Sequence, residues 1–190
     1  MQTMVFRIGL ALAVAIPGAA LPAQQPTAVI AEGPLVGDRA PDFSLPWATR
    51  EGVGVGPLWS LSANRGRVVV LAFYPKDFTP GCTAQMKAFT EQYADLFGDD
   101  VVVVGINADS LETHVRFAQT LGLPFKLLTD AGQTVSRRYG SADVNGYNRR
   151  TVYVVDRKGN VAYVDRRFEA LDPRSYSELK AAVQAARRTR

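Results

Sequence analysis

The chain has 190 residues, of which 47% are hydrophobic and 21% are charged, a composition typical of one globular domain with a substantial core. Its single cysteine excludes an intramolecular disulfide, and one cysteine with one histidine, His114, cannot supply the four ligands of a usual structural zinc site. The net charge of +4 does not indicate a nucleic-acid-binding protein, because Lys and Arg are scattered and cluster only in the final ARRTR.

The N-terminal segment predicts a cleaved secretory signal peptide. Arg7 precedes an apolar stretch that a Pro-Gly pair interrupts, and small residues follow it. The stretch is too short and too broken for a membrane-spanning helix, which needs about 20 apolar residues. We therefore expect a signal peptide over residues 1–23, a linker over 24–35 and one domain over 36–190, exported to a bacterial periplasm without stable membrane insertion.

After the linker, strand and helix signals alternate. The runs VVVLAFY (68–74) and VVVVGI (101–106) are short, apolar and rich in β-branched residues, as in strands buried on both faces. A helix is expected over 82–97. Another is expected in DSLETHVRFAQTLG, with Asp109 and Glu112 as its capping box and a glycine as its stop.

The second half of the chain continues the alternation. FKLLTD predicts a strand, GQTVSRRYG a short helix, and TVYVVDRKGNVAYVD two strands joined by a turn. A final helix is expected from about Pro173, and its buried positions are Tyr176, Leu179, Ala182, Val183 and Ala186. The order of elements predicts an α/β fold with a central mixed β-sheet and helices on both faces.

The single cysteine lies in FYPKDFTPGCTAQ, just after the first buried strand. That strand brings the chain to the carboxyl edge of the sheet, and Cys82 falls in the first turn of a surface-facing helix start. Free backbone N–H groups and the helix dipole favour a thiolate there. Thr79 can aim a hydroxyl at whatever the sulfur attacks, and Pro75 stiffens the loop. The combination predicts a shielded nucleophile rather than an inert core cysteine.

Other cysteine chemistries fit the sequence less well. His114 is expected on the surface of a helix with no Asn or Asp to orient it, so a papain-like hydrolase is not indicated. The absence of Cys-x-x-Cys argues against a disulfide reductase. GVGVG (52–56) lacks the spacing of a nucleotide-binding loop and predicts a hairpin or loop.

The cysteine segment resembles the peroxiredoxins, which are AhpC/TSA-type thiol peroxidases with a thioredoxin-like fold. Pro75, Thr79 and Cys82 match the signature P-x-x-x-T/S-x-x-C, and FYPKDFTPGCTAQ is most similar to the bacterioferritin comigratory protein or PrxQ branch. VGDRAPDFSL, the segment 101–130 and RTVYVVDRKGNV resemble their counterparts in the same order. The resemblance covers nearly all of the expected domain.

This resemblance implies roles for individual residues. Cys82 would be the peroxidatic cysteine, Thr79 would hydrogen-bond the peroxide, and Pro75 would shield the sulfenic acid. The resemblance selects Arg150 as the active-site arginine, whereas strand alternation says only that Arg149 and Arg150 point to opposite faces. Gln85 would be a supporting partner, because it takes a position where the family carries Glu or Gln.

Lys87 stands where the PrxQ branch often has a resolving cysteine, five residues after Cys82. We therefore expect a one-cysteine enzyme that reduces hydrogen peroxide and organic hydroperoxides. Its sulfenic acid would be resolved by an external thiol, which is thioredoxin-like, glutaredoxin-like or a small molecule. The resemblance implies no metal, flavin or haem, and a monomer or weak dimer. The alternative is a redox-signalling or chaperone module on the same fold, without fast peroxidase turnover.

Overall fold

The computed structural model describes residues 32–189. The expected signal peptide and most of the expected linker therefore lie outside the described residues. Within that range, no helix is both long enough and apolar enough to cross a membrane.

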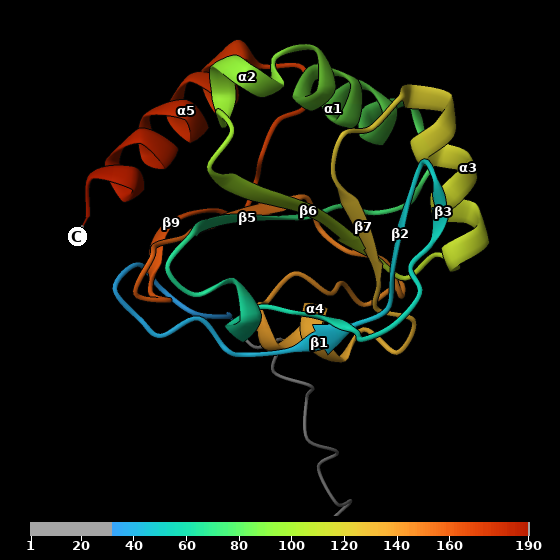
Figure 1. The fold of residues 1–190 in the computed structure, drawn as a ribbon, viewed down its shortest axis with the longest axis horizontal. Helices are drawn as coiled ribbons and strands as arrows, with labels where there is room; N and C mark the ends of the chain where they lie inside the picture. Colours follow the sequence, from blue (N-terminus) through green and yellow to red (C-terminus); the bar gives the residue numbers. More distant parts are fainter. Residues whose placement is uncertain (1–31, 190) are drawn as a thin grey trace, which may run out of the picture.

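A mixed sheet of seven strands forms the centre of the domain (Figure 1). Its strands, in spatial order, are β3 (Gly52–Val53), β2 (Trp47–Thr49), β7 (Lys126–Thr129), β6 (Val101–Asn107), β5 (Val68–Phe73), β8 (Thr151–Val155) and β9 (Val161–Asp165). The three middle strands β7, β6 and β5 run parallel, and β2 and β8 pair antiparallel on either side of them. β1 (Ser44–Leu45) and β4 (Trp59–Ser60) form a separate antiparallel pair.

Helices cover both faces of this sheet, as predicted. On one face lie α1 (Pro80–Glu91), α2 (Tyr93–Leu96), α3 (Leu111–Leu121) and α5 (Pro173–Arg188) (Figure 1). On the other lie α4 (Thr134–Arg138), the β1–β4 pair and a short 3-10 turn (Ser62–Asn64). The fold is therefore the expected α/β arrangement.

The alternation of side chains along β5 divides the core into two halves. All six residues of β5 are buried. Val70 and Ala72 belong to the cluster under α1 and α5, whereas Leu71 and Phe73 belong to the cluster on the opposite face with Tyr139 of the α4 region. A strand buried on both faces reads as a continuous apolar run, which is why its position was readable from sequence.

Two helix boundaries differ from the prediction. The helix expected over 82–97 is two helices, because the chain leaves helical geometry at Gln92 between α1 and α2. The N-cap of α3 is Ser110, whose side chain accepts a hydrogen bond from the backbone N–H of Thr113, so the Asp109–Glu112 capping box was wrong. Gly122 does end this helix, in the left-handed conformation with φ 62°.

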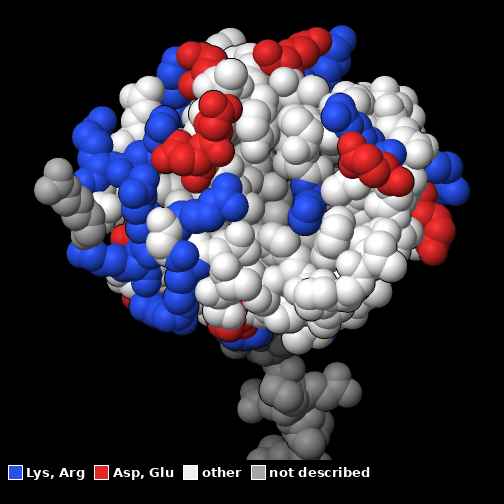
Figure 2. Space-filling model, in the orientation of Figure 1, with Lys and Arg blue, Asp and Glu red and all other residues white. Residues whose placement is uncertain are grey.

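The hairpin expected around GVGVG is present, since β3 pairs with β2. Basic side chains, scattered in the sequence, gather in space around the end of α5 (Figure 2). Arg187 of that helix and Arg157 of the β8–β9 turn both pair with Asp100. The gathering is therefore a partly neutralised surface at the end of the sheet away from the cysteine loop.

Candidate active site

Cys82 lies in the first turn of α1, immediately after the loop that leaves β5. Pro80 takes the first helical position, where its missing N–H is not needed, and Thr79 is the N-cap in an extended conformation. The expectation of a surface-facing position was wrong, because Cys82 is 0% exposed and packs in the core cluster under α1. Any reactant, a peroxide included, therefore needs some movement of the surrounding loop or side chains to reach its sulfur.

Arg150 brings a positive charge to this sulfur. Its Nη2 lies 3.6 Å from Sγ of Cys82, and its Nη1 donates to Oε1 of Gln85 at 2.6 Å. Gln85 is fully buried and leaves its Nε2 without a partner among the described residues. The amide of Gln85 therefore fixes the guanidinium beside the sulfur, and the arrangement stabilises negative charge at that point.

The two neighbouring arginines have different surroundings. Arg150 directly precedes β8, and its carbonyl accepts from the N–H of Phe168. Arg149 is exposed, and its backbone N–H donates to Ser141. The structure thus brings Arg150 to the cysteine and leaves the side chain of Arg149 at the surface.

Gly81, which the sequence analysis did not single out, makes room for this arginine. A Cβ atom at Gly81 would stand 3.0 Å from Nη2 of Arg150. The glycine in TPGC therefore has a steric reason: any side chain there would push the guanidinium away. The sequence alone could not predict this steric requirement, because Arg150 is distant from Gly81 in the chain.

Thr79 and Pro75 flank the loop before Cys82 and are both partly buried. The side chain of Thr79 makes no capping hydrogen bond, and its hydroxyl donates to the carbonyl of Lys76 at 3.0 Å. It makes no hydrogen bond with the sulfur in this arrangement. Rotation of the Thr79 side chain to another staggered rotamer would free the hydroxyl for a ligand.

A buried polar network lies under the same loop. Asp77 accepts at Oδ1 from the hydroxyl of Tyr74 at 2.6 Å and from Nδ2 of Asn107 at 3.1 Å. Its Oδ2 lies 2.8 Å from Nδ1 of His114. The expectation of a surface histidine without an acidic partner was wrong, because His114 is 0% exposed and pairs with Asp77. The partner was invisible in sequence because 37 residues separate the two.

The network keeps the tyrosine next to the site protonated. Burial raises the pKa of Tyr74 well above its ordinary value, and the negative charges of Asp77, Cys82 and Asp109 raise it further. Tyr74 therefore acts as a hydrogen-bond donor to Asp77.

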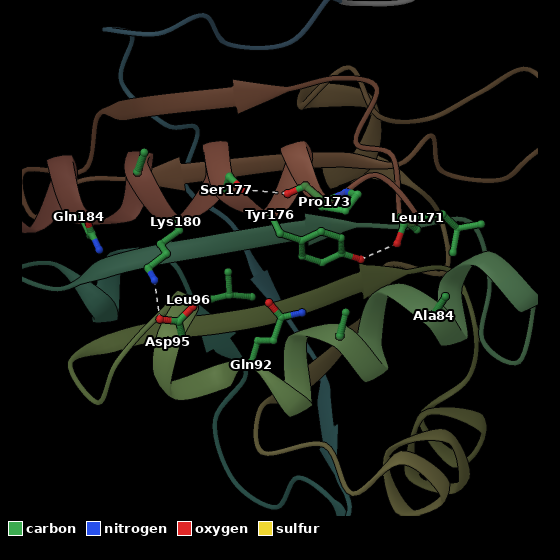
Figure 3. A pocket seen from close by; sticks show the side chains of 13 residues that line it. Ala84, Gln92, Asp95, Leu96, Leu171, Pro173, Tyr176, Ser177, Lys180 and Gln184 are labelled. Carbon is green, nitrogen blue, oxygen red and sulfur yellow. Dashed lines mark hydrogen bonds and ion pairs between the residues drawn. The ribbon is translucent and has the colours of Figure 1, made fainter.

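No cluster of His, Cys, Asp and Glu among residues 32–189 could hold a metal ion. An open groove of about 730 Å³ runs between α1, α2 and α5, with Ala84 and Tyr176 among its lining residues (Figure 3). An ion pair between Asp95 and Lys180 bridges it. Cys82 and Arg150 do not line the groove, so the sulfur chemistry belongs to the loop and not to this hollow.

Comparison with known proteins identifies relatives of this arrangement. Residues 36–164 match the AhpC/TSA family. A Coxiella burnetii protein described as a peroxiredoxin of the bcp type is 40% identical over 136 residues, which are 68% of this chain and 86% of that protein. The chloroplastic peroxiredoxin Q of Oryza sativa subsp. japonica is 40% identical over 130 residues, which are 67% of this chain and 57% of the plant protein.

Among solved structures, the peroxidoxin BcpB of Mycobacterium tuberculosis superimposes with a TM-score of 0.67 and 28% identity. The match covers 79% of this chain and 96% of that one. The thioredoxin-like fold expected from the resemblance is thereby confirmed.

Proposed function

Because the chain belongs to the AhpC/TSA family and is a thiol-dependent peroxidase of the bcp and peroxiredoxin Q type, we propose that Cys82 is the residue that its peroxide substrate oxidises. The observation that carries this assignment is the guanidinium of Arg150, 3.6 Å from the sulfur of the only cysteine. This guanidinium places hydrogen-bond donors beside the sulfur, where the oxygens of a bound peroxide would lie. The alternative of a non-catalytic module on the same fold gives no reason for this arrangement.

The reaction follows from the positions of these groups. The Cys82 thiolate attacks the terminal oxygen of a hydroperoxide, the O–O bond breaks, and the leaving alkoxide or hydroxide takes a proton. The products are a Cys82 sulfenic acid and an alcohol or water. Arg150 and the N–H groups of the first turn of α1 stabilise the charge that develops on the peroxide oxygens, with Gln85 holding Arg150 in place.

Thr79 and Pro75 complete the proposed site. A peroxide beside the sulfur would offer the Thr79 hydroxyl a better acceptor than the carbonyl of Lys76, which it now uses. Pro75, at the start of the loop, limits the access of water to the sulfenic acid. With one cysteine in the chain, an external thiol must then reduce the sulfenic acid.

Consumption of peroxide by the purified protein tests this function. Hydrogen peroxide and an alkyl hydroperoxide should both disappear in the presence of a thiol, and the Cys82→Ser variant should consume neither. Dithiothreitol, a thioredoxin system and a glutathione–glutaredoxin system should be compared. The comparison identifies the class of thiol that reduces the sulfenic acid. Wild-type protein that consumes no peroxide with any of these thiols would refute the proposal.

We also propose that the protein is exported to a bacterial periplasm and acts as a monomer or weak dimer. The apolar stretch before residue 24 and the small residues that follow it support export. Fusion of residues 1–23 to an alkaline phosphatase reporter tests this, because that reporter is active only outside the cytoplasm. Sedimentation of the reduced protein at two concentrations tests the oligomeric state.

A further inference from the structure

The buried network under the cysteine loop joins three elements that meet only in the folded chain. Asp77 belongs to the loop between β5 and α1, Asn107 ends β6, and His114 lies on α3. The N–H of Asp77 donates to Oδ2 of Asp109 at 2.7 Å, in addition to the three contacts of the Asp77 carboxylate. The loop is therefore held through both the backbone and the side chain of one residue.

His114 makes the most specific of these contacts. Its side chain has no exposed surface, and Nδ1 reaches Oδ2 of Asp77 as a donor to the carboxylate. Its Nε2 has no partner among the described residues. Burying a polar ring with one nitrogen unpaired costs stability, so an apolar side chain would be the better choice if packing were the only requirement.

The loop that Asp77 holds is also strained. Phe78, the next residue, has φ 60°, a left-handed conformation that a bulky side chain rarely adopts, and it is 50% exposed. Thr79 and the start of α1 follow directly. Contacts that over-determine the loop are needed to keep a residue in such a conformation, and Asp77 provides them on the side away from the solvent.

The two halves of the proposed reaction make opposite demands on this loop. Oxidation needs Arg150 beside the sulfur, so the loop can part only slightly to admit a peroxide. Reduction needs an external thiol to reach the same sulfur, and Cys82 is 0% exposed. Because a thiol brings a large sulfur with its carrier, the loop must open before the mixed disulfide forms.

From these contacts we propose that Asp77 and His114 are positioning residues that hold the loop closed and so set the balance between oxidation by peroxide and capture by thiol. The proposal rests on the peroxidase function of Cys82. In the capture step the thiol sulfur bonds to Sγ, the S–OH bond breaks, and the hydroxyl leaves as water with the thiol proton. No further oxidant or reductant is required.

Paired substitutions of His114 test the proposal. His114→Asn keeps a donor on the atom bonded to Cγ, where Nδ1 now stands, whereas His114→Leu fills similar space without a donor. Cys82 oxidation is followed by rapid mixing with one equivalent of hydrogen peroxide. Capture is followed by adding the coloured thiol thionitrobenzoate to the preformed sulfenic acid and recording the loss of colour.

We expect His114→Leu to be oxidised at least about tenfold more slowly and captured faster than wild type, because the loop opens more often. His114→Asn should stay within about threefold of wild type in both steps, which a purely steric role of the ring would not produce. A folded Leu variant with both rates unchanged, or with both rates lowered, would overturn the proposal. So would an Asn variant that behaves like the Leu variant.

A second variant covers the case in which His114→Leu does not fold. Asp77→Ala removes the carboxylate that His114 contacts, and the same two rates are measured with the same criteria. If the wild-type protein formed no sulfenic acid, the proposed peroxidase function of Cys82 itself would be refuted. That result is visible without any variant and is thus distinct from a failure of the positioning role.

Discussion

Gly81 leaves the space that the guanidinium of Arg150 needs: a Cβ atom added to the glycine would stand 3.0 Å from Nη2 of the arginine. Glycine within a helix costs about 0.5–1 kcal/mol relative to alanine. The close approach of the guanidinium to Cys82 gives a reason for accepting this cost, because the same guanidinium lies 3.6 Å from Sγ.

Gly81→Ala therefore separates stability from activity. Alanine favours the helix, and the atom that it meets is the mobile end of a side chain, so the free energy of unfolding should not fall. The guanidinium must shift, and the rate of Cys82 oxidation should drop about tenfold. Denaturant unfolding and rapid-mixing kinetics on the same samples check the two effects, and an unchanged oxidation rate would show that Arg150 tolerates the shift.

Arg150→Met and Arg149→Met form a matched pair. Removing the guanidinium from position 150 should slow Cys82 oxidation about a hundredfold, because one donor near the reacting oxygens is lost. The same change at exposed position 149 should leave the rate within about twofold, since typical surface side chains contribute little. If Arg149→Met slowed oxidation and Arg150→Met did not, the assignment of the catalytic role to Arg150 would be wrong.

The sequence predicted the parts of this protein that depend on local pattern. Buried strands such as β5 read as apolar runs, and the turn before Cys82 read as a helix start. The contacts between distant segments were not readable. Asp77 with His114 and Gly81 with Arg150 depend on how the loop after β5 packs against α3 and the start of β8, and no periodicity encodes that packing.

The burial of Cys82 gives Cys82→Ser two expected effects. Peroxide consumption should be abolished, because a hydroxyl is not a comparable nucleophile. The free energy of unfolding should fall by about 1–2 kcal/mol, since a polar group replaces a thiol that is 0% exposed. Urea unfolding of the reduced wild type and the variant measures the difference, and equal midpoints would mean that a neighbour such as Arg150 satisfies the hydroxyl.

Tyrosines that are buried or partly buried limit the stability of the fold at alkaline pH. Burial raises the pKa of Tyr163 from 10.0 to about 12 and that of Tyr139 further. A raised folded pKa means that the folded state keeps the proton when the unfolded state has lost it. The stabilisation that these protonated tyrosines contribute to the folded state is therefore complete below about pH 10. It is lost as pH rises through the pKa of the folded state. Midpoints of thermal unfolding should decline above pH 10, and a flat profile to pH 12 would contradict this.

With one cysteine in the chain, no internal thiol can resolve the sulfenic acid. Peroxide added without thiol should give a single turnover, after which Cys82 stays as a sulfenic acid that dimedone traps. Excess peroxide should carry it to sulfinic and sulfonic acid, because each step needs only the lower oxidation state and more oxidant. Mass spectrometry of the intact protein distinguishes these states. Quantitative disulfide-linked dimer on a non-reducing gel would refute the one-cysteine route.

Lys87→Cys then asks whether an internal resolving thiol can be restored. Positions 82 and 87 both lie on α1, and five residues of helix separate them by about 7.5 Å along the axis. A disulfide needs Cα atoms within about 6.8 Å, so the first turns of α1 must unwind before the bond forms. Because position 87 is exposed and its only ion pair within residues 32–189 is with Glu91, the substitution should not destabilise the reduced protein. We expect the variant to form the internal disulfide and to lose the dimedone adduct. Persistence of the adduct would show that α1 stays wound while the sulfenic acid waits for an external thiol.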